Sequence, residues 1–478
     1  MASRFAGVIL GLTVVALACG GKSSSVDAGL SSDAGAGDAG SIDAGQDAGL
    51  PDGGVDPYSD IAQGPTSVFS QFFGQSDSVT FGMTAAADHD GGFVNPVVYQ
   101  TPTYSQMDAD HIWPDERTFY GHIFGASAVD GGASIEMTAH AAVDSYGVID
   151  VGGTCGENAK CQDQTHGPGV VGGYLFQIDD SRGLDSVLYS VVYLGGRDAG
   201  TVTVDGIATD ATGDVYVVGA LQGDQGFGLL NVSSTVRTPY VARFSGKLVP
   251  RWVEDVGTAG ALSELDSVVV GANGLVVVGG RGAADGGRPV VAALDGDGGL
   301  LWASDLKDAA GRVVGLGWSG DEWVAAVAAD APCDPAESPC SPAPSGWVVA
   351  GDSSATVRWE LPITGRPTAI AANAAQTIVG IDAHDTVLLG TGRVRLPSDV
   401  PSIVAVALQP DGGILWKDSV SAESSARFAL TSVALGDEGT VMLSGETESP
   451  VAFEWDNPVV GTPQAAFFSV LGYPDGGP

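Results

Sequence analysis

Cysteine is the residue type in this chain whose spacing points most directly to chemistry. Four of the five cysteines form two close pairs, Cys155 with Cys161 and Cys333 with Cys340. Neither pair has the C-x-x-C spacing of a zinc site, and no pair of histidines accompanies them, so we expect no metal and no cofactor. Each pair instead predicts a disulfide that closes a short loop and stabilises it by about 2 kcal/mol.

Histidines are concentrated between residues 89 and 166. Five of the six lie in this range: His89, His111, His122, His140 and His166. His140 heads a strand that we expect to be innermost, where its imidazole could face a central channel, whereas His89 is expected in a solvated turn and His166 in a solvated loop. No acidic or histidine partner stands at ligand spacing, so structural or solvated roles are predicted for all of them.

Sequence signatures of the common enzyme classes are absent. There is no HExxH motif, no GxSxG nucleophile elbow and no phosphate-binding loop, so we assign no catalytic residue. The chain has 58 acidic and 20 basic residues and a formal net charge of −38. Such a charge repels phosphate backbones and anionic lipid surfaces, which excludes nucleic-acid binding.

The N-terminus predicts export. Arg4 precedes an apolar run, Phe5 to Ala18, that is too short to span a bilayer. The ending "ALAC" resembles a lipoprotein signal box, although Ala16 stands where leucine is usual. We therefore predict a signal peptide over residues 1–18 and a lipid on Cys19, in the cell envelope. Because Gly20 rather than Asp follows, the resemblance implies the outer membrane of a Gram-negative bacterium; without acylation the chain would be secreted.

Residues 19–60 are expected to form a disordered tether. They contain five Asp-Ala-Gly triplets and almost no large apolar side chains, so there is little to bury in a core. Residues 61–478 make up the folded part. Membrane contact is expected through the lipid anchor alone.

A strand-turn-strand motif recurs along residues 61–478. In "GIATDATGDVYVVG", from Gly206, two alternating segments flank a tight turn that carries Asp210, a position also held by Asp88 and Asp144. The seven copies place these residues in the turn: Gly91, Gly147, Gly213, Gly274, Gly320, Gln376 and Gly439. Glycine suits a turn with positive φ.

A second hairpin follows the first, which gives four strands for each repeat. In four repeats it ends in a tryptophan that we expect to fill space between neighbouring sheets: Trp252, Trp302, Trp359 and Trp416. A four-stranded sheet with two apolar faces is buried when copies stack around an axis, so the pattern predicts an all-β, seven-bladed β-propeller. Ser67 to Phe73 is expected to pair with Ala466 to Leu471 and complete the last blade.

The motifs carry a family resemblance. "IATDATGDVYVVG" (from Ile207), "YVARFSGKLVPRW" (from Tyr240) and "AVDSYGVIDVGG" (from Ala142) are similar to the β-propeller repeat of bacterial exported proteins. The resemblance covers Ser67 to Gly477. It implies fold and export, and no single activity.

Function is less well defined by the sequence. We expect a surface-anchored, monomeric, non-enzymatic binding or scaffold module for an extracellular protein or glycan, because inner segments such as "SVVVG" are apolar. Its long second-to-third connections, such as Leu221 to Pro239, are expected to be variable binding loops. The alternative is an exported propeller enzyme, either a polysaccharide lyase or hydrolase or a quinone-dependent oxidoreductase. An enzyme should gather polar side chains at one end of the channel.

Overall fold

The computed structural model describes most of the chain beyond residue 61. The described residues are 62–63, 66–73, 79–88, 91–101, 104–112, 118–128, 137–157, 159–161, 164–166, 169–179, 188–195, 200–257, 262–284, 286–330, 344–384, 386–390, 392–396, 400–422, 427–436, 439–448 and 465–472. All of them fall in the unit Asp56–Pro478, and Met1–Val55 is a separate unit. The predicted signal peptide, Cys19, the tether, the pair Cys333 and Cys340, and His89 lie outside the described residues.

The described part of the chain is an all-β structure built of mainly antiparallel sheets. Hydrogen bonding defines six of them, which we call sheets I to VI. Sheet I contains β3 (Val79–Gly82), β4 (Ala86–Ala87), β5 (Phe93–Gln100), β6 (Tyr104–Ile112), β7 (Thr118–Ala128), β10 (Ala159–Cys161) and β11 (Gln164–Thr165). Sheet II contains β8 (His140–Val143), β9 (Ile149–Cys155), β12 (Val170–Asp179), β13 (Leu188–Leu194), β14 (Gly200–Val202), β15 (Gly206–Thr209), β16 (Val215–Phe227), β17 (Leu230–Phe244) and β18 (Pro250–Asp255).

The remaining four sheets have fewer strands. Sheet III contains β19 (Leu262–Val270), β20 (Val276–Gly282), β21 (Pro289–Leu294) and β22 (Leu300–Asp305). Sheet IV contains β23 (Gly311–Ser319), β24 (Glu322–Ala329), β25 (Gly346–Gly351), β26 (Val357–Ile363), β29 (Thr386–Leu389) and β30 (Gly392–Arg395). Sheet V contains β1 (Ala62–Gln63), β27 (Arg366–Ala372), β28 (Thr377–Ala383), β31 (Ser402–Leu408) and β32 (Ile414–Ser421). Sheet VI contains β2 (Thr66–Phe73), β33 (Phe428–Leu435), β34 (Val441–Thr447) and β35 (Ala465–Gly472). Within these sheets, β1 with β32 and β12 with β14 pair in parallel.

The predicted strand-turn-strand hairpins are present in all seven copies. They are β4–β5, β8–β9, β15–β16, β19–β20, β23–β24, β27–β28 and β33–β34. The six turn glycines have positive φ, as predicted. In the sixth copy the side chain of Asn373 closes the turn instead, because its Oδ1 accepts hydrogen bonds from the backbone N–H groups of Ala375 and Gln376. Sheet II therefore holds two copies of the repeat.

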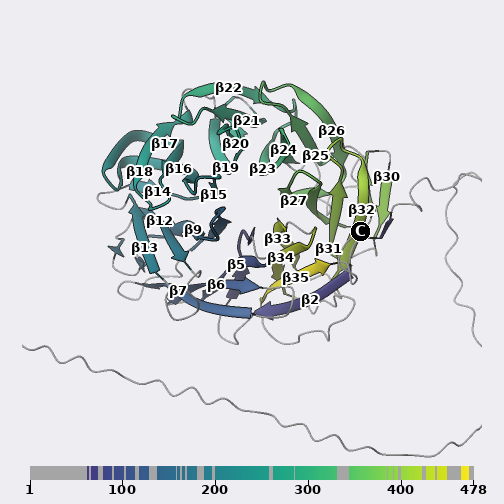
Figure 1. Cartoon of the computed structure of the whole chain (residues 1–478), viewed down its shortest axis with the longest axis horizontal. Coiled ribbons are helices and arrows are strands. Elements are labelled where there is room, and N and C mark those ends of the chain that lie inside the picture. The colour runs from purple at the N-terminus through teal and green to yellow at the C-terminus, as the bar shows by residue number, and fades with distance from the viewer. Residues whose placement is uncertain are drawn as a thin grey trace, which may run out of the picture. The chain divides into compact units, whose positions relative to one another are not determined.

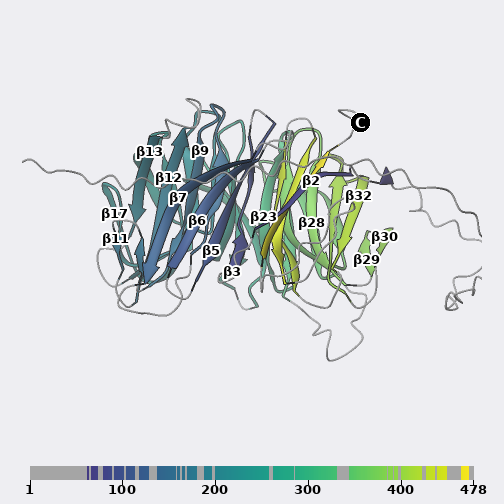
Figure 2. The same cartoon turned by 90° about the horizontal axis from the view of Figure 1, so that it is seen from below.

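Apolar cores lie between neighbouring sheets, which is why the middle strands are buried on both faces. In β21 all six residues are buried, whereas the outer strand β22 alternates between half-buried and exposed positions. One core joins Phe93 and Val97 of sheet I to Met442 and Phe468 of sheet VI. Figure 1 shows the sheets following one another in chain order around a common centre, and Figure 2 shows the same strands from the side.

The two ends of the folded part share sheet VI. β2 pairs with β35 in antiparallel register, from Ser67 opposite Leu471 to Phe73 opposite Ala466. The predicted pairing of these segments is confirmed, and Figure 1 shows purple β2 beside yellow β35. None of the described residues belongs to a helix with the length and hydropathy needed to cross a lipid bilayer.

Three of the connections between second and third strands, which we predicted to be loops, contain strands in the described part of the chain. In the segment Leu221 to Pro239, β16 and β17 continue their ladder out to Phe227 opposite Leu230. Phe227 also pairs with Leu194 on β13. Two other connections behave in the same way, since β10 pairs with β7 and β29 pairs with β26. The predicted loop conformation was wrong for these three connections because apolar residues inside them are buried against the preceding strand group; their binding role stays a prediction.

Candidate functional site: a cavity at the centre of the inner strands

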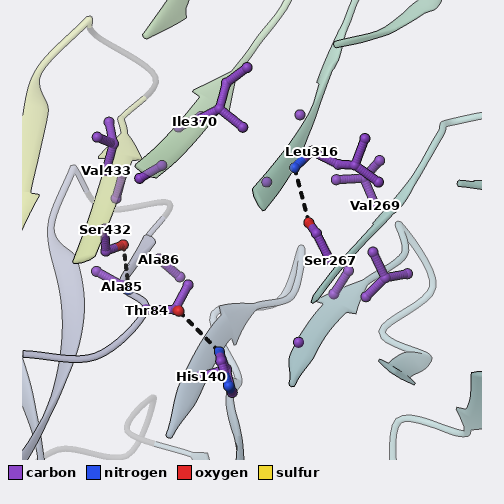
Figure 3. A pocket seen from close by; sticks show the side chains of 18 of the residues that line it. Thr84, Ala85, Ala86, His140, Ser267, Val269, Leu316, Ile370, Ser432 and Val433 are labelled. Atoms are coloured by element: carbon purple, nitrogen blue, oxygen red, sulfur yellow. Dashed lines mark hydrogen bonds between the residues drawn. The ribbon is translucent and has the colours of Figure 1, made fainter. Parts of the chain in front are cut away.

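The first strands of all the repeats border one cavity of about 620 Å³. Its wall is formed by residues 84–87 together with β8, β15, β19, β23, β27 and β33 or the residues beside them. Figure 3 shows side chains from several of these strands converging on it. A volume of this size is typical of small-molecule sites, which occupy roughly 300–1,000 Å³.

Small residues line most of the wall because the inner strands lie close to one another. A Cβ added to Gly315 would lie 2.9 Å from Cγ2 of Ile370, and one added to Gly317 would lie 2.7 Å from Cβ of Ala372. The neighbouring alanines and valines add little bulk. The sequence prediction of an apolar wall is therefore correct for this part of the cavity.

Hydroxyl side chains bridge adjacent inner strands around the cavity. Oγ of Ser432 accepts a 2.8 Å hydrogen bond from the backbone N–H of Ala85, and Oγ of Ser267 accepts one of 3.0 Å from that of Leu316. Oγ1 of Thr84 lies 3.0 Å from Nδ1 of His140 (Figure 3). Side-chain contacts of this kind fix the spacing of the strands that form the wall.

Charged side chains also line the cavity, which the sequence analysis did not predict. Asp205, Asp266 and Arg312 stand at the same distance before the turn glycines of three successive repeats, and Arg366 begins the next inner strand. Asp205 directly precedes β15, Arg312 is the second residue of β23, and Asp266 lies within β19. His140, at the start of β8, lines the same cavity. We call these five residues the polar mouth. By the criterion stated above, such clustering is a feature expected of an enzyme, and it also suits a cavity that binds a ligand.

Burial governs ionisation at the polar mouth. Burial raises the pKa of Asp266 to about 6, even though Arg312 Nη1 lies 3.6 Å from its Oδ1. Burial also raises the pKa of Asp205, whose Oδ2 accepts a 3.0 Å hydrogen bond from Oγ1 of Thr203. Burial lowers the pKa of His140 to about 4, so the imidazole is neutral near pH 7. The polar mouth therefore offers two guanidinium groups, two carboxyl groups and a neutral imidazole together.

The predicted histidine roles are only partly correct. His140 lines the cavity, as expected for the head of an innermost strand. His111 does have an acidic partner, because its Nε2 lies 2.9 Å from Oδ2 of Asp88 and both side chains are buried. The prediction missed this pair because Asp88 lies in the turn after β4 whereas His111 lies on β6, and nothing local in the sequence links the two. The side chain of His122 is outside the described residues.

His166 is buried beside the first cysteine pair rather than solvated. Cys155 and Cys161 lie at disulfide-bonding distance, with their Cα atoms 6.5 Å apart, consistent with the predicted bridge. A ring nitrogen of His166 and both Sγ atoms lie within 4.8 Å of one another. Burial lowers the pKa of His166. Sequence spacing failed to reveal this cluster because the hairpin β10–β11 folds His166 back over the pair.

The repeated aspartates and tryptophans behave as structural residues. Oδ1 of Asp144 and Oδ1 of Asp210 each accept hydrogen bonds from two backbone N–H groups of their own turns, as expected for aspartate in that place. Tryptophans bridge neighbouring strand groups: Trp252 Nε1 donates to the carbonyl of Gly296, Trp302 to Ser353 and Trp359 to Pro410.

Comparison with known proteins adds no functional assignment. No protein-family model matches this chain. No curated protein matches it either. Among solved structures it is similar to a protein of unknown function from Dyadobacter fermentans DSM 18053, with 12% sequence identity and a TM-score of 0.43, over 86% of this chain and 99% of that one.

Proposed function

We propose that residues 61–478 form a seven-bladed β-propeller with four antiparallel strands in each blade. Three observations support the proposal: the seven hairpins of the repeat, the single cavity bordered by all their first strands, and the pairing of β2 with β35. In this architecture sheet II supplies two blades, and the N-terminal strand completes the last one. Closure through strands from both ends leaves no unpaired edge.

We further propose that this propeller is a non-enzymatic binding module held in the cell envelope. The apolar run before Cys19 and the acidic segment 19–60 support export, lipidation and a tether, and the whole would act as a monomer. If Cys19 is not acylated, the same module is secreted.

The polar mouth is the place where this module binds its ligand, and it is the single observation that carries the proposal. Side chains of both charges border a cavity of about 620 Å³ whose deeper wall is made of small apolar residues. Such a cavity admits the end of a glycan rather than the surface of a folded protein. A glycan that carries carboxylate or amino groups would find complementary charges in Arg312 and Asp266.

The proposal can be tested with saturation-transfer-difference NMR. The probes are neutral, acidic and amino-bearing oligosaccharides, added to the exported chain. We expect a charged probe to bind and Arg312→Gln or Asp266→Asn to weaken its binding at least about tenfold. Arg358→Gln is the matched control, because Arg358 lies on the outer strand β26 and is half exposed. Binding that is equal in all variants, or no binding of any charged oligosaccharide, would contradict the proposal.

A hydrolase is the second candidate. Asp266, with a pKa of about 6, could act as a general acid beside the carboxyl group of Asp205. A time course with the same oligosaccharides separates the two functions, because an enzyme releases shorter products and a binding module returns the probe unchanged.

A further inference from the structure

We propose that Cys155, Cys161 and His166 form a zinc site that is available when the two cysteines are reduced. This site is separate from the polar mouth and does not depend on the function proposed for it. It gives the first cysteine pair two alternative states, a disulfide and a metal-bound dithiolate.

The residues have the identities and the proximity that zinc requires. Two thiolates and one imidazole are preferred zinc ligands, at distances of about 2.3 Å for sulfur and 2.0 Å for nitrogen. Their ligand atoms already lie within 4.8 Å of one another, and all three side chains are buried. Small shifts of the cysteine side chains would therefore bring all three onto one ion.

The orientation of His166 also fits a ligand. Its Nδ1 lies 3.4 Å from the backbone carbonyl oxygen of Gly156, and hydrogen bonds from an imidazole to a backbone carbonyl are among those that orient metal-binding histidines. The ring lies against Gly172, where an added Cβ would come within 2.5 Å of its Cε1 and 2.6 Å of its Nε2. Glycine at this position of β12 thus leaves room for the imidazole.

The loop that carries the ligands is held in place without a metal. The backbone N–H of His166 donates a 2.7 Å hydrogen bond to the carbonyl of Ala159, and that of Gly169 donates one of 2.6 Å to Oε2 of Glu157. β10 is also paired with β7 of the preceding repeat. Because two hydrogen bonds and the pairing of β10 with β7 already hold the backbone, the ligands lose little conformational freedom when the ion binds.

The conversion of the disulfide into the metal-bound dithiolate balances in electrons, protons and ligands. An external dithiol gives two electrons and two protons to the disulfide, which yields two thiols, and is itself oxidised to a disulfide. Zn²⁺ then displaces the two thiol protons and accepts the imidazole nitrogen, so binding releases two protons at most. Water takes the fourth position, as in zinc sites with three protein ligands.

The test compares metal uptake by the oxidised and the reduced chain. Zinc content is measured by mass spectrometry after dialysis, and Co²⁺ is used as a probe because cobalt-thiolate coordination gives a near-ultraviolet charge-transfer band. We expect the reduced chain to bind one equivalent that the oxidised chain does not. Cys155→Ser with Cys161→Ser should abolish this uptake, whereas Cys333→Ser with Cys340→Ser removes as many thiols and should retain it.

The histidine is tested separately. His166→Ala should raise the zinc dissociation constant more than about tenfold, and His384→Ala, which alters an exposed histidine, should leave it unchanged. Circular dichroism of each variant checks that it is folded, and the comparison of oxidised with reduced natural chain needs no substitution. The proposal is overturned if the reduced chain takes up no zinc, if uptake survives loss of Cys155 and Cys161, or if a folded His166→Ala chain binds as tightly.

Discussion

The hydroxyl group of Ser444 donates a 3.0 Å hydrogen bond to Oδ1 of Asn95, although 349 residues separate the two along the chain. Ser444 lies on β34 of sheet VI and Asn95 on β5 of sheet I, and both side chains are fully buried. This bond therefore joins the last sheet of the chain to the first. A second link, between Ser432 and the backbone of Ala85, crosses the same boundary nearer the cavity.

Ser444→Ala should destabilise the fold by about 1–3 kcal/mol, because it leaves a buried amide oxygen of Asn95 without its donor. The measurement is chemical unfolding followed by circular dichroism. Ser233→Ala, an exposed serine on β17, is the control and should change stability by less than about 0.5 kcal/mol. A coupling energy near zero in a double-mutant cycle with Asn95→Ala would show that the hydrogen bond does not stabilise this boundary.

Trp302→Phe should lower the free energy of unfolding by about 1 kcal/mol more than a tryptophan replacement that breaks no hydrogen bond. The indole N–H of Trp302 donates a 2.8 Å bond to the carbonyl of Ser353 in the next sheet, and phenylalanine keeps the ring without the donor. Trp347→Phe is the matched control, since its indole nitrogen makes no hydrogen bond within the described part of the chain and its ring contacts Lys307. Equal losses in the two variants would indicate that ring size alone matters.

The repeat could be predicted from the sequence because its signals are local. Each hairpin is set by alternating residues on either side of a turn, and glycines such as Gly213 and Gly274 mark turns with positive φ. The pairing of β2 with β35 followed from counting strands at both ends. Strand extensions such as Phe227 beside Leu194 were missed, because nothing in one segment reveals the strand that it will meet.

The polar mouth was missed for a related reason. Asp205, Asp266 and Arg312 are far apart in sequence, and each looks like an ordinary polar residue in its own repeat. They meet only when the first strands converge on one cavity. A comparison of equivalent positions across the repeats would have revealed them, since each precedes its turn glycine by the same number of residues.

Gly213→Ala should destabilise the protein more than Gly274→Ala, although the two glycines have nearly the same φ of 80° and 78°. Both replacements force an L-residue into a left-handed conformation, at a cost of about 1–2 kcal/mol. At Gly213 the new Cβ would also lie 2.8 Å from Oδ2 of Asp144, whereas at Gly274 nothing lies within 4 Å. Thermal unfolding of the two variants measures the difference, and equal melting temperatures would mean that Asp144 moves away at no cost.

Asp150→Asn should flatten the pH dependence of stability between about pH 4 and pH 8. Burial raises the pKa of Asp150 to about 8, with Asp144 raising it further, while the hydrogen bond from Gln177 Nε2 to its Oδ1 opposes the shift. In the unfolded chain the same carboxyl group has a pKa near 3.9, so between these values the folded state binds the extra proton. Its contribution to stability is therefore complete below about pH 4 and is lost as the pH rises through 8.

Asparagine keeps the acceptor for Gln177 and cannot ionise, so Asp150→Asn should raise the melting temperature most at pH 8 and least at pH 4. The measurement is thermal unfolding at a series of pH values. Asp297→Asn is the control, because Asp297 is exposed in the turn between β21 and β22. If both variants and the natural chain lose stability equally between pH 4 and 8, the proton on Asp150 does not contribute. A half-buried carboxyl group such as that of Asp382, whose pKa burial raises to about 6, would then account for the slope.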